Sequence, residues 1–101
     1  MSAFTVVRFR AKPDRAQEFE DLFKVIERKM PGLQRFVLIK SGERNFCSIA
    51  EWDTFDHIVR ARETMRGNLD RMRPLLEEFS EELGVTDPMS GEAVLDMALA
   101  R

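Results

Sequence analysis

The chain has 101 residues, which is enough for a single domain over residues 1–101 with one hydrophobic core. Hydrophobic residues make up 44% of the chain and charged residues 34%, a balance that excludes a disordered protein. The formal net charge of −2 excludes a strongly basic nucleic-acid-binding domain, and no apolar run approaches the roughly 18 residues that a membrane span needs.

The first predicted elements are a strand and a helix. Residues 3–10 are β-branched and aromatic, so they predict a strand that is apolar on both faces and covered on both. We expect the helix to start at Asp14, which forms a capping box with Gln17, and to end at Pro31 and Gly32. Its apolar stripe at helical spacing consists of Phe19, Leu22, Phe23, Ile26 and Met30.

Residues 33–40 and 46–52 predict two further strands. The turn between them, residues 41–45, contains a glycine, so we expect an antiparallel hairpin. The next helix starts at Asp53 or Thr54, because either side chain can cap it. Its expected buried side consists of Phe55, Ile58, Val59 and Met65.

A break within the second helical region is predicted at Gly67, as C-cap, with Asn68 as the N-cap of a further helix. Pro74 removes one backbone donor and is expected to kink or restart that helix, which ends at Gly84. Its apolar positions are Leu69, Met72, Leu76, Phe79 and Leu83. Residues 92–99 then predict a fourth strand, although their composition suits a helix equally.

The resulting order, β-α-β-β-α-α-β, is that of a ferredoxin-like split βαβ domain of the α+β class, with a four-stranded antiparallel sheet and helices on one face. Helices can cover only one face of this sheet, yet the strands carry apolar residues on both. We therefore expect a homodimer in which a second subunit covers the other sheet face.

Three stretches resemble a known family: VVRFRAKPDRAQEF, MPGLQRFVLIKS and the strand-to-helix junction AEWDTFDH. Over residues 4–98 the chain resembles the antibiotic-biosynthesis-monooxygenase (ABM)-like proteins of the dimeric α+β barrel superfamily. The resemblance implies that the sheets of two subunits close into a barrel, and that each subunit has a small-molecule pocket between sheet and helices. Members include cofactor-independent oxygenases of aromatic polyketides, haem-degrading enzymes and proteins with no assigned reaction.

The haem-degrading branch uses an asparagine on the first strand, a later tryptophan and a histidine. Here no asparagine precedes Asn45, and Ala61 and Arg71 stand near the other two positions, so we expect no haem degradation and no cofactor or metal. Two readings remain. One is a cofactor-independent monooxygenase acting on a small aromatic or enolisable molecule, without the tyrosine that some relatives use. The other is a non-catalytic ligand-binding or structural barrel.

The predicted ligand-binding residues are Trp52, Phe46, Ser48 and Arg8. The first three share one face of a strand, where a small residue beside a tryptophan leaves room for a ligand or for a helix. Arg8 would hold a carboxylate or enolate if it faces the pocket. Otherwise a sheet arginine needs a partner, and Glu51 is the expected one.

Trp52 and His57 are the candidate catalytic residues, the first through its indole N–H and the second as a general base. The alternatives are a packing tryptophan and an exposed helix histidine. Cys47 is expected to pack as a small apolar side chain, and a single cysteine excludes an internal disulfide and fits a reducing cytoplasm. Cys47 and Trp52 should point to opposite sheet faces, so no triad with His57 is expected.

Arginines are frequent between residues 60 and 73, and glutamates follow between 77 and 82. The arginines are Arg60, Arg62, Arg66, Arg71 and Arg73. They could attract an anion to a pocket mouth or complement a second subunit. The alternative is a solvated helix surface with ion pairs worth less than about 1 kcal/mol each.

Overall fold

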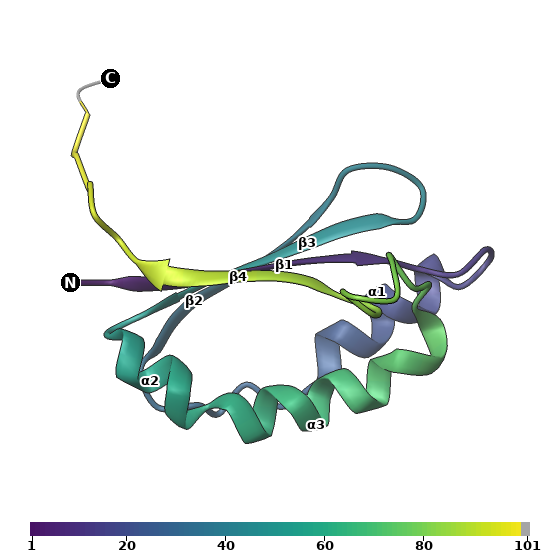
Figure 1. The fold of residues 1–101 in the computed structure, drawn as a ribbon, viewed down its shortest axis with the longest axis horizontal. Coiled ribbons are helices and arrows are strands. Elements are labelled where there is room, and N and C mark those ends of the chain that lie inside the picture. The colour runs from purple at the N-terminus through teal and green to yellow at the C-terminus, as the bar shows by residue number, and fades with distance from the viewer. Residues whose placement is uncertain (100–101) are drawn as a thin grey trace.

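A computed structural model describes residues 1–99 and shows a four-stranded sheet with the helices against one face (Figure 1). The elements are β1 (Ala3–Arg10), α1 (Ala16–Val25), β2 (Leu33–Lys40), β3 (Asn45–Trp52), α2 (Phe55–Arg60), α3 (Arg62–Met72), the 3₁₀ turn η1 (Arg73–Leu75) and β4 (Asp87–Glu92). The predicted ferredoxin-like order of strands and helices is confirmed.

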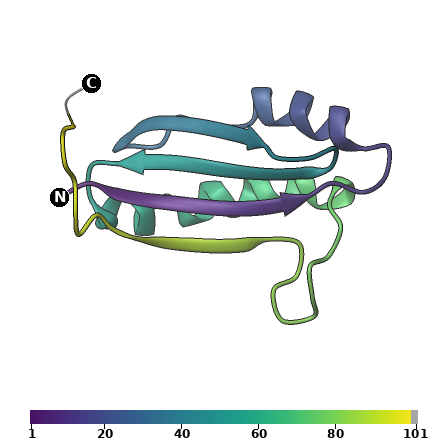
Figure 2. The same cartoon turned by 90° about the horizontal axis from the view of Figure 1, so that it is seen from above.

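β1 lies inside the sheet, whose order is β2-β3-β1-β4 (Figure 2). Every neighbouring pair is antiparallel, and Ala3 faces both Trp52 of β3 and Glu92 of β4. The predicted hairpin of β2 and β3 is confirmed. β1 is therefore hydrogen-bonded on both sides, to β3 and to β4, which lie far along the chain. The edges of the sheet are β2 and β4.

The two faces of the sheet differ in cover. Along β3, Phe46, Ser48, Ala50 and Trp52 are buried beneath the helices, while Cys47 points to the other side, as alternation requires. We call that other side the open face, because no helix of residues 1–99 lies over it (Figure 1). The strand registers place on it Phe4, Val6, Arg8, Arg35, Val37, Ile39, Cys47, Ile49, Glu51, Asp87 and Met89.

The core under the helices consists of two hydrophobic clusters. In the first, Phe19 of α1 packs on Phe9, Phe23 and Phe46, with ring centroids 5.3, 5.4 and 4.9 Å away. The second lies around Trp52 near α2 and includes Ala3, Met30, Ala50, Ile58 and Ala61. The helix layer therefore contacts the sheet most closely at two separate places.

The second helical region differs from its prediction. The Thr54 cap is confirmed, but α3 runs through Gly67 without a break, and Val59 is 41% exposed rather than buried. Pro74 falls in η1, after α3 ends at Met72. The helix predicted up to residue 84 is wrong, because Leu76 is extended and pairs with Ala11, which buries it in the first cluster.

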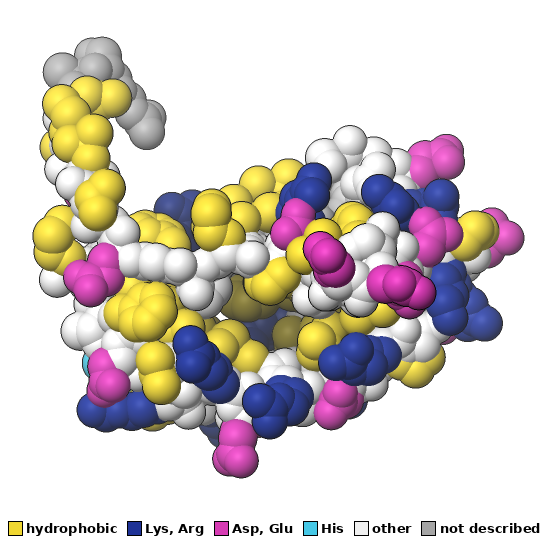
Figure 3. Space-filling view, in the orientation of Figure 1, with side chains coloured by type: hydrophobic (Ala, Val, Ile, Leu, Met, Phe, Trp, Pro, Cys, Tyr) yellow, Lys and Arg dark blue, Asp and Glu magenta, His cyan; other side chains and the backbone are white. Residues whose placement is uncertain are grey.

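The fourth strand is also wrong as predicted, because β4 is Asp87–Glu92, not residues 92–99. Its sequence, DPMSGE, is poor in strand formers. An edge strand tolerates a proline, however, and β1 supplies a complete pairing edge. Residues 93–99 have no regular structure and project away from the domain (Figures 1 and 3). Their exposed apolar side chains are Val94, Leu95, Met97 and Leu99.

The first helix also differs at both ends. The predicted capping box of Asp14 and Gln17 is absent: Arg15 is the N-cap without a side-chain bond, and Asp14 adopts a φ of 64°. α1 ends at Val25 instead of Pro31, because Ile26 is extended. Arg28 then donates a side-chain hydrogen bond to the Phe23 carbonyl, so an arginine satisfies part of the free helix end.

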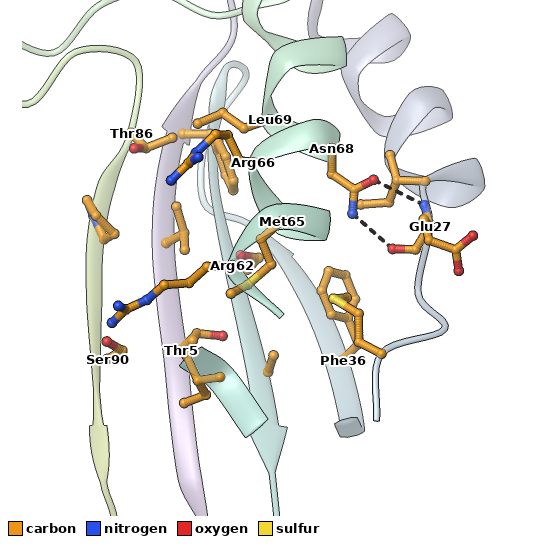
Figure 4. Close-up of a pocket in the computed structure, with 18 of the residues that line it drawn as sticks. Thr5, Glu27, Phe36, Arg62, Met65, Arg66, Asn68, Leu69, Thr86 and Ser90 are labelled. Carbon is orange, nitrogen blue, oxygen red and sulfur yellow. Dashed lines mark hydrogen bonds between the residues drawn. The ribbon is translucent and has the colours of Figure 1, made fainter. Parts of the chain in front are cut away.

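Asn68 holds the non-helical segment 26–30 against α3. It does not cap a helix, as predicted, but lies within α3 and is 7% exposed. Its Nδ2 donates to the Glu27 carbonyl at 2.9 Å, and the Glu27 N–H donates to Asn68 Oδ1 at 3.2 Å (Figure 4). One side chain therefore satisfies both backbone polar groups of Glu27, whose carbonyl could not have bonded along a continued helix because residue 31 is a proline.

His57 packs directly on Gly32 at the turn before β2. Gly32 has a φ of +86°, and a Cβ at this position would lie 2.3 Å from His57 Cγ. His57 Nδ1 is 2.8 Å from Thr54 Oγ1, which fixes the ring over the turn. Both the backbone angle and the close approach require glycine here.

Gly32→Ala is expected to lower the free energy of unfolding by about 3 kcal/mol, from backbone strain and steric overlap with His57. Gly84→Ala is the matched control, because Gly84 has a φ of +71° with no atom within 4 Å of the added Cβ. The free energy of unfolding of Gly84→Ala, measured in urea, should fall by only about 1 kcal/mol. Adding His57→Ala to Gly32→Ala should recover only part of the difference, because the Cβ that remains at residue 57 would still lie 2.6 Å from the added Cβ. Equal losses in the two glycine variants would refute the packing role of His57.

Asn68→Ala is expected to lower the free energy of unfolding by about 2 kcal/mol, because the amide and carbonyl of Glu27 lose their partner. Asn45→Ala, at an exposed asparagine, is the control and should change it by less than about 0.5 kcal/mol. Trp52 fluorescence in urea measures both. A change no larger in Asn68→Ala than in Asn45→Ala would show that the paired bonds contribute nothing.

Candidate functional site

A cavity of about 510 Å³ lies between the two hydrophobic clusters, under α3. Its volume falls in the range of small-molecule sites. Residues of both clusters line it: Phe9, Phe23 and Ile26 from the first, and Met30, Ala50, Trp52 and Ile58 from the second. It opens between α3 and β4, where the space-filling view shows a hollow (Figure 3).

The sheet side of the cavity is apolar with a few hydroxyl groups. Val7 and Ala50 provide apolar surface, and Thr5 and Ser48 add oxygens. Trp52, which is 1% exposed, donates its indole N–H to Thr5 Oγ1 at 3.2 Å. The indole proton is therefore already bonded. Thr5, having accepted it, keeps its own O–H for a further acceptor.

The helix side comes from one face of α3. Arg62, Met65, Arg66 and Leu69 recur at spacings of three and four, so they lie on one side of the helix. Met65 and Leu69 add apolar surface. Arg62 and Arg66 extend from α3 towards β4, where Ser90 and Thr86 lie on the opposite rim (Figure 4).

Two carboxylates also line the cavity, Glu27 and Asp70. Asp70 Oδ1 accepts a hydrogen bond from Arg73 Nε at 3.0 Å, and Glu27 Oε1 accepts one from the Lys29 N–H at 2.6 Å. Both residues are exposed. The interior of the cavity is therefore lined by apolar and hydroxyl-bearing residues, and its charged residues are exposed.

The predicted ligand-binding residues are distributed over three places. Trp52 and Ser48 line the cavity. Phe46 shares their sheet face but packs inside the first cluster, outside the lining. Arg8 lies on the open face, away from the cavity, and its predicted partner Glu51 is not the one it binds: its Nε donates to Asp87 Oδ2 at 2.9 Å.

His57 and Cys47, the single histidine and the single cysteine of the chain, lie outside the cavity lining. His57 packs on Gly32 beyond the end of β3, and Cys47 is on the open face. The expectation that Cys47, Trp52 and His57 do not converge is confirmed by these positions.

Four lining residues were not predicted: Thr5, Asn68, Ser90 of β4, and Thr86, which directly precedes β4. Thr5 alternates with Val7 and Phe9 on β1, so the strand period could have identified it. Asn68 follows Met65 by three residues on α3. A prediction of one continuous helix through Gly67 would therefore have placed Asn68 near the cavity side of the helix. Thr86 and Ser90 could not be found while β4 was placed too late in the chain.

Residues 1–99 contain no group of three histidine, cysteine or acidic side chains close enough to hold a metal ion. Within the same range, no helix has the length and hydrophobicity to cross a membrane.

Solved structures share this fold at low sequence identity. SnoaB, a cofactor-independent oxygenase from Streptomyces nogalater, is 19% identical, with a TM-score of 0.73 over 95% of this chain and 96% of that one. Rv0793 from Mycobacterium tuberculosis is 15% identical, with a TM-score of 0.74 over 98% and 100%. A dimeric ferredoxin-like protein from an uncultured marine organism is 11% identical, with a TM-score of 0.74 over 98% and 93%.

Among curated proteins, none matches the sequence. The model of the antibiotic biosynthesis monooxygenase family matches residues 3–65, which run from β1 into α3 and include the cavity residues Thr5, Ser48, Trp52 and Met65. Because this match covers more than half of the chain, the protein belongs to the antibiotic biosynthesis monooxygenase (ABM) family.

Proposed function

We propose that the protein binds a small aromatic or enolisable molecule in the cavity and oxidises it with molecular oxygen, without a cofactor. The observation that carries this proposal is the cavity itself, an apolar space of about 510 Å³ with hydroxyl-bearing residues and a charged mouth. Family membership supports it, as does the shared fold with an oxygenase described as cofactor-independent.

The proposed reaction converts an activated CH₂ group between aromatic rings into a carbonyl. Loss of one proton gives an electron-rich enolate, which transfers electrons to oxygen and forms a C–O bond as a hydroperoxide. Loss of water then leaves the C=O group. One oxygen atom enters the product and the other leaves as water, so the substrate supplies all four electrons and no external reductant is needed.

The protein would contribute a dry, shaped space and hydrogen-bond donors. Met65, Leu69 and the indole of Trp52 would hold a flat ring system between sheet and helix. The hydroxyl of Thr5, positioned by Trp52, would donate to an oxygen that becomes negative on enolisation. In this proposal Trp52 shapes the wall and positions Thr5, and His57 has a structural role.

A non-catalytic binding protein is the second candidate, because the lining offers no buried base. Among the described residues, the lining includes neither His57 nor Cys47, and its carboxylates, Glu27 and Asp70, are exposed. A substrate that loses its proton readily in water would not need such a base and could still react. A substrate that does not lose its proton in water would bind without reacting. Oxygen uptake separates the two candidates.

We also propose that the protein is a homodimer through the open face. Within the described residues this face has no cover, yet it carries Val6, Val37 and Ile49 at its centre, and Ile39 and Met89 are 43% and 69% exposed. A hollow of about 240 Å³ between Phe4, Arg35, Val37, Ile49 and Glu51 can accept side chains of a second copy. A structural neighbour of the same fold is described as dimeric.

Oxygen uptake with a panel of anthrones tests the proposed reaction, with at least one member expected to consume oxygen without added metal or cofactor. Ser48→Leu fills the cavity and should lower kcat/KM about 100-fold, because the ring can no longer reach its position. Cys47→Ser, one residue away on the open face, is the control and should keep the rate. Binding without oxygen uptake across the panel would favour the non-catalytic candidate.

Ile49→Asp is expected to convert the dimer into a monomer, because a carboxylate at the centre of the apolar interface would lose its hydration on association. Light scattering at micromolar concentration gives the mass. Val59→Asp, an equal change on an exposed helix position, should leave the dimer intact. A wild-type protein that is monomeric at this concentration would overturn the dimer proposal.

A further inference from the structure

We propose that Arg62 and Arg66, the arginine pair, form an anion-binding site at the cavity mouth, and that the ligand is a flat aromatic molecule bearing one carboxylate or similar oxyanion. The inference rests on the proposed binding of a small molecule in the cavity. It does not depend on the reaction with oxygen.

The arginine pair is placed to contact the end of a ligand rather than its rings. Arg62 and Arg66 are one helical turn apart on α3, so their side chains leave the helix in the same direction. Both line the cavity, and both extend across its opening towards β4 (Figure 4). A planar oxyanion between them can accept hydrogen bonds from two guanidinium groups, which suit carboxylate geometry.

The charges at the mouth do not cancel. Of the three arginines that line the cavity, Arg73 is paired with Asp70 at 3.0 Å. Arg60, next to α3 but outside the lining, is paired with Asp56. Within residues 1–99, the arginine pair takes part in no ion pair. The remaining lining carboxylate, Glu27, comes from the segment after α1, away from β4 (Figure 4).

Burial decides how such a ligand would lie. The arginine pair is exposed, whereas Trp52, Ala50 and Ile58 at the inner end of the cavity are almost fully buried. A charged group placed at the inner end would lose its hydration without a cationic partner. At the mouth the same group keeps contact with water and with both guanidinium groups. The oxyanion therefore lies at the mouth and the rings extend inwards, beside Thr5 and Ser48.

The rim opposite the arginine pair adds neutral donors. Thr86 and Ser90 lie on the β4 side of the opening, and both line the cavity (Figure 4). Hydroxyl groups can donate to an oxyanion without adding charge. The mouth thus offers cationic donors from α3 and neutral donors from β4, a combination that favours an anion over a neutral or cationic group.

The experiment compares two dyes with the same ring system, anilinonaphthalene sulfonate and its uncharged parent N-phenylnaphthylamine. Both fluoresce more strongly in apolar sites, and energy transfer from Trp52, the single tryptophan, reports binding beside the cavity wall. Titrations use the full chain as wild type, Arg62→Gln/Arg66→Gln, and the control Arg60→Gln, which removes one arginine charge outside the cavity lining. Ser48→Leu tests whether the dyes occupy the cavity.

In the wild type we expect the sulfonate to bind about tenfold more tightly than the neutral dye at low salt, with the preference decreasing as salt is added. The double arginine variant should lose about tenfold in affinity for the sulfonate and less than about twofold for the neutral dye. Arg60→Gln should leave both affinities unchanged, and Ser48→Leu should weaken both.

Three outcomes would overturn the proposal. The wild type could bind both dyes with equal affinity, or the double arginine variant could lose the same affinity for both dyes. The third outcome is that Arg60→Gln lowers the affinity for the sulfonate as much as the double arginine variant does. In each of these cases, neutral-dye binding that Ser48→Leu abolishes would leave the cavity intact as a ligand site. Failure of both dyes to bind, or binding that Ser48→Leu does not affect, would instead contradict the proposed function together with the inference.

Discussion

The paired hydrogen bonds between Asn68 and the backbone of Glu27 are the interaction on which the cavity depends. They hold the non-helical segment 26–30, in which Ile26 is extended, between α1 and β2. Ile26 then reaches the first hydrophobic cluster and Met30 the second. In a continued helix these two residues would be about 6 Å apart along the axis and on the same helix face. Because the segment is not helical, the two residues instead contact different clusters, with the cavity between them.

The same geometry separates the polar from the apolar parts of the site. Strand alternation places Thr5, Ser48 and Trp52 on the cavity side, and helix periodicity places Met65 and Leu69 opposite them. The longer arginine side chains on the same helix face reach beyond this apolar layer to the mouth. A ligand that is flat and apolar at one end and anionic at the other would match both parts without a buried charge.

The two faces of the sheet have different consequences for function. Under the helices the strands form a core and a cavity within one chain. On the open face, similar apolar residues remain uncovered within the described chain, and segment 93–99 leaves the domain with its apolar side chains exposed. Cavity and open face share β1 and β3, so substitutions on alternate residues of one strand, such as Ser48 and Ile49, test binding and association separately.

Much of the fold could be predicted from local pattern. The three strands and their hairpin follow from β-branched and aromatic runs, and the Thr54 cap follows from a local side-chain bond. Trp52 and Ser48 were assigned to one face by parity, which needs no tertiary information. The predictions are wrong where the hydrogen-bond partners of backbone groups come from outside the element itself. α1 ends early because Asn68 and Arg28 supply partners after Val25, and β4 forms from DPMSGE because β1 offers an edge.

By itself, the sequence determined the order of elements, the ferredoxin-like class and which residues of β1 and β3 share a sheet face, since these depend on periodicities of two and about four residues. Only the tertiary structure decided where α1 ends, which segment forms β4, that Arg8 binds Asp87 on the open face, and that Arg62 and Arg66 meet the rim of a cavity. The physical reason is that each of these features requires contacts between residues far apart in the chain, which local propensity does not encode.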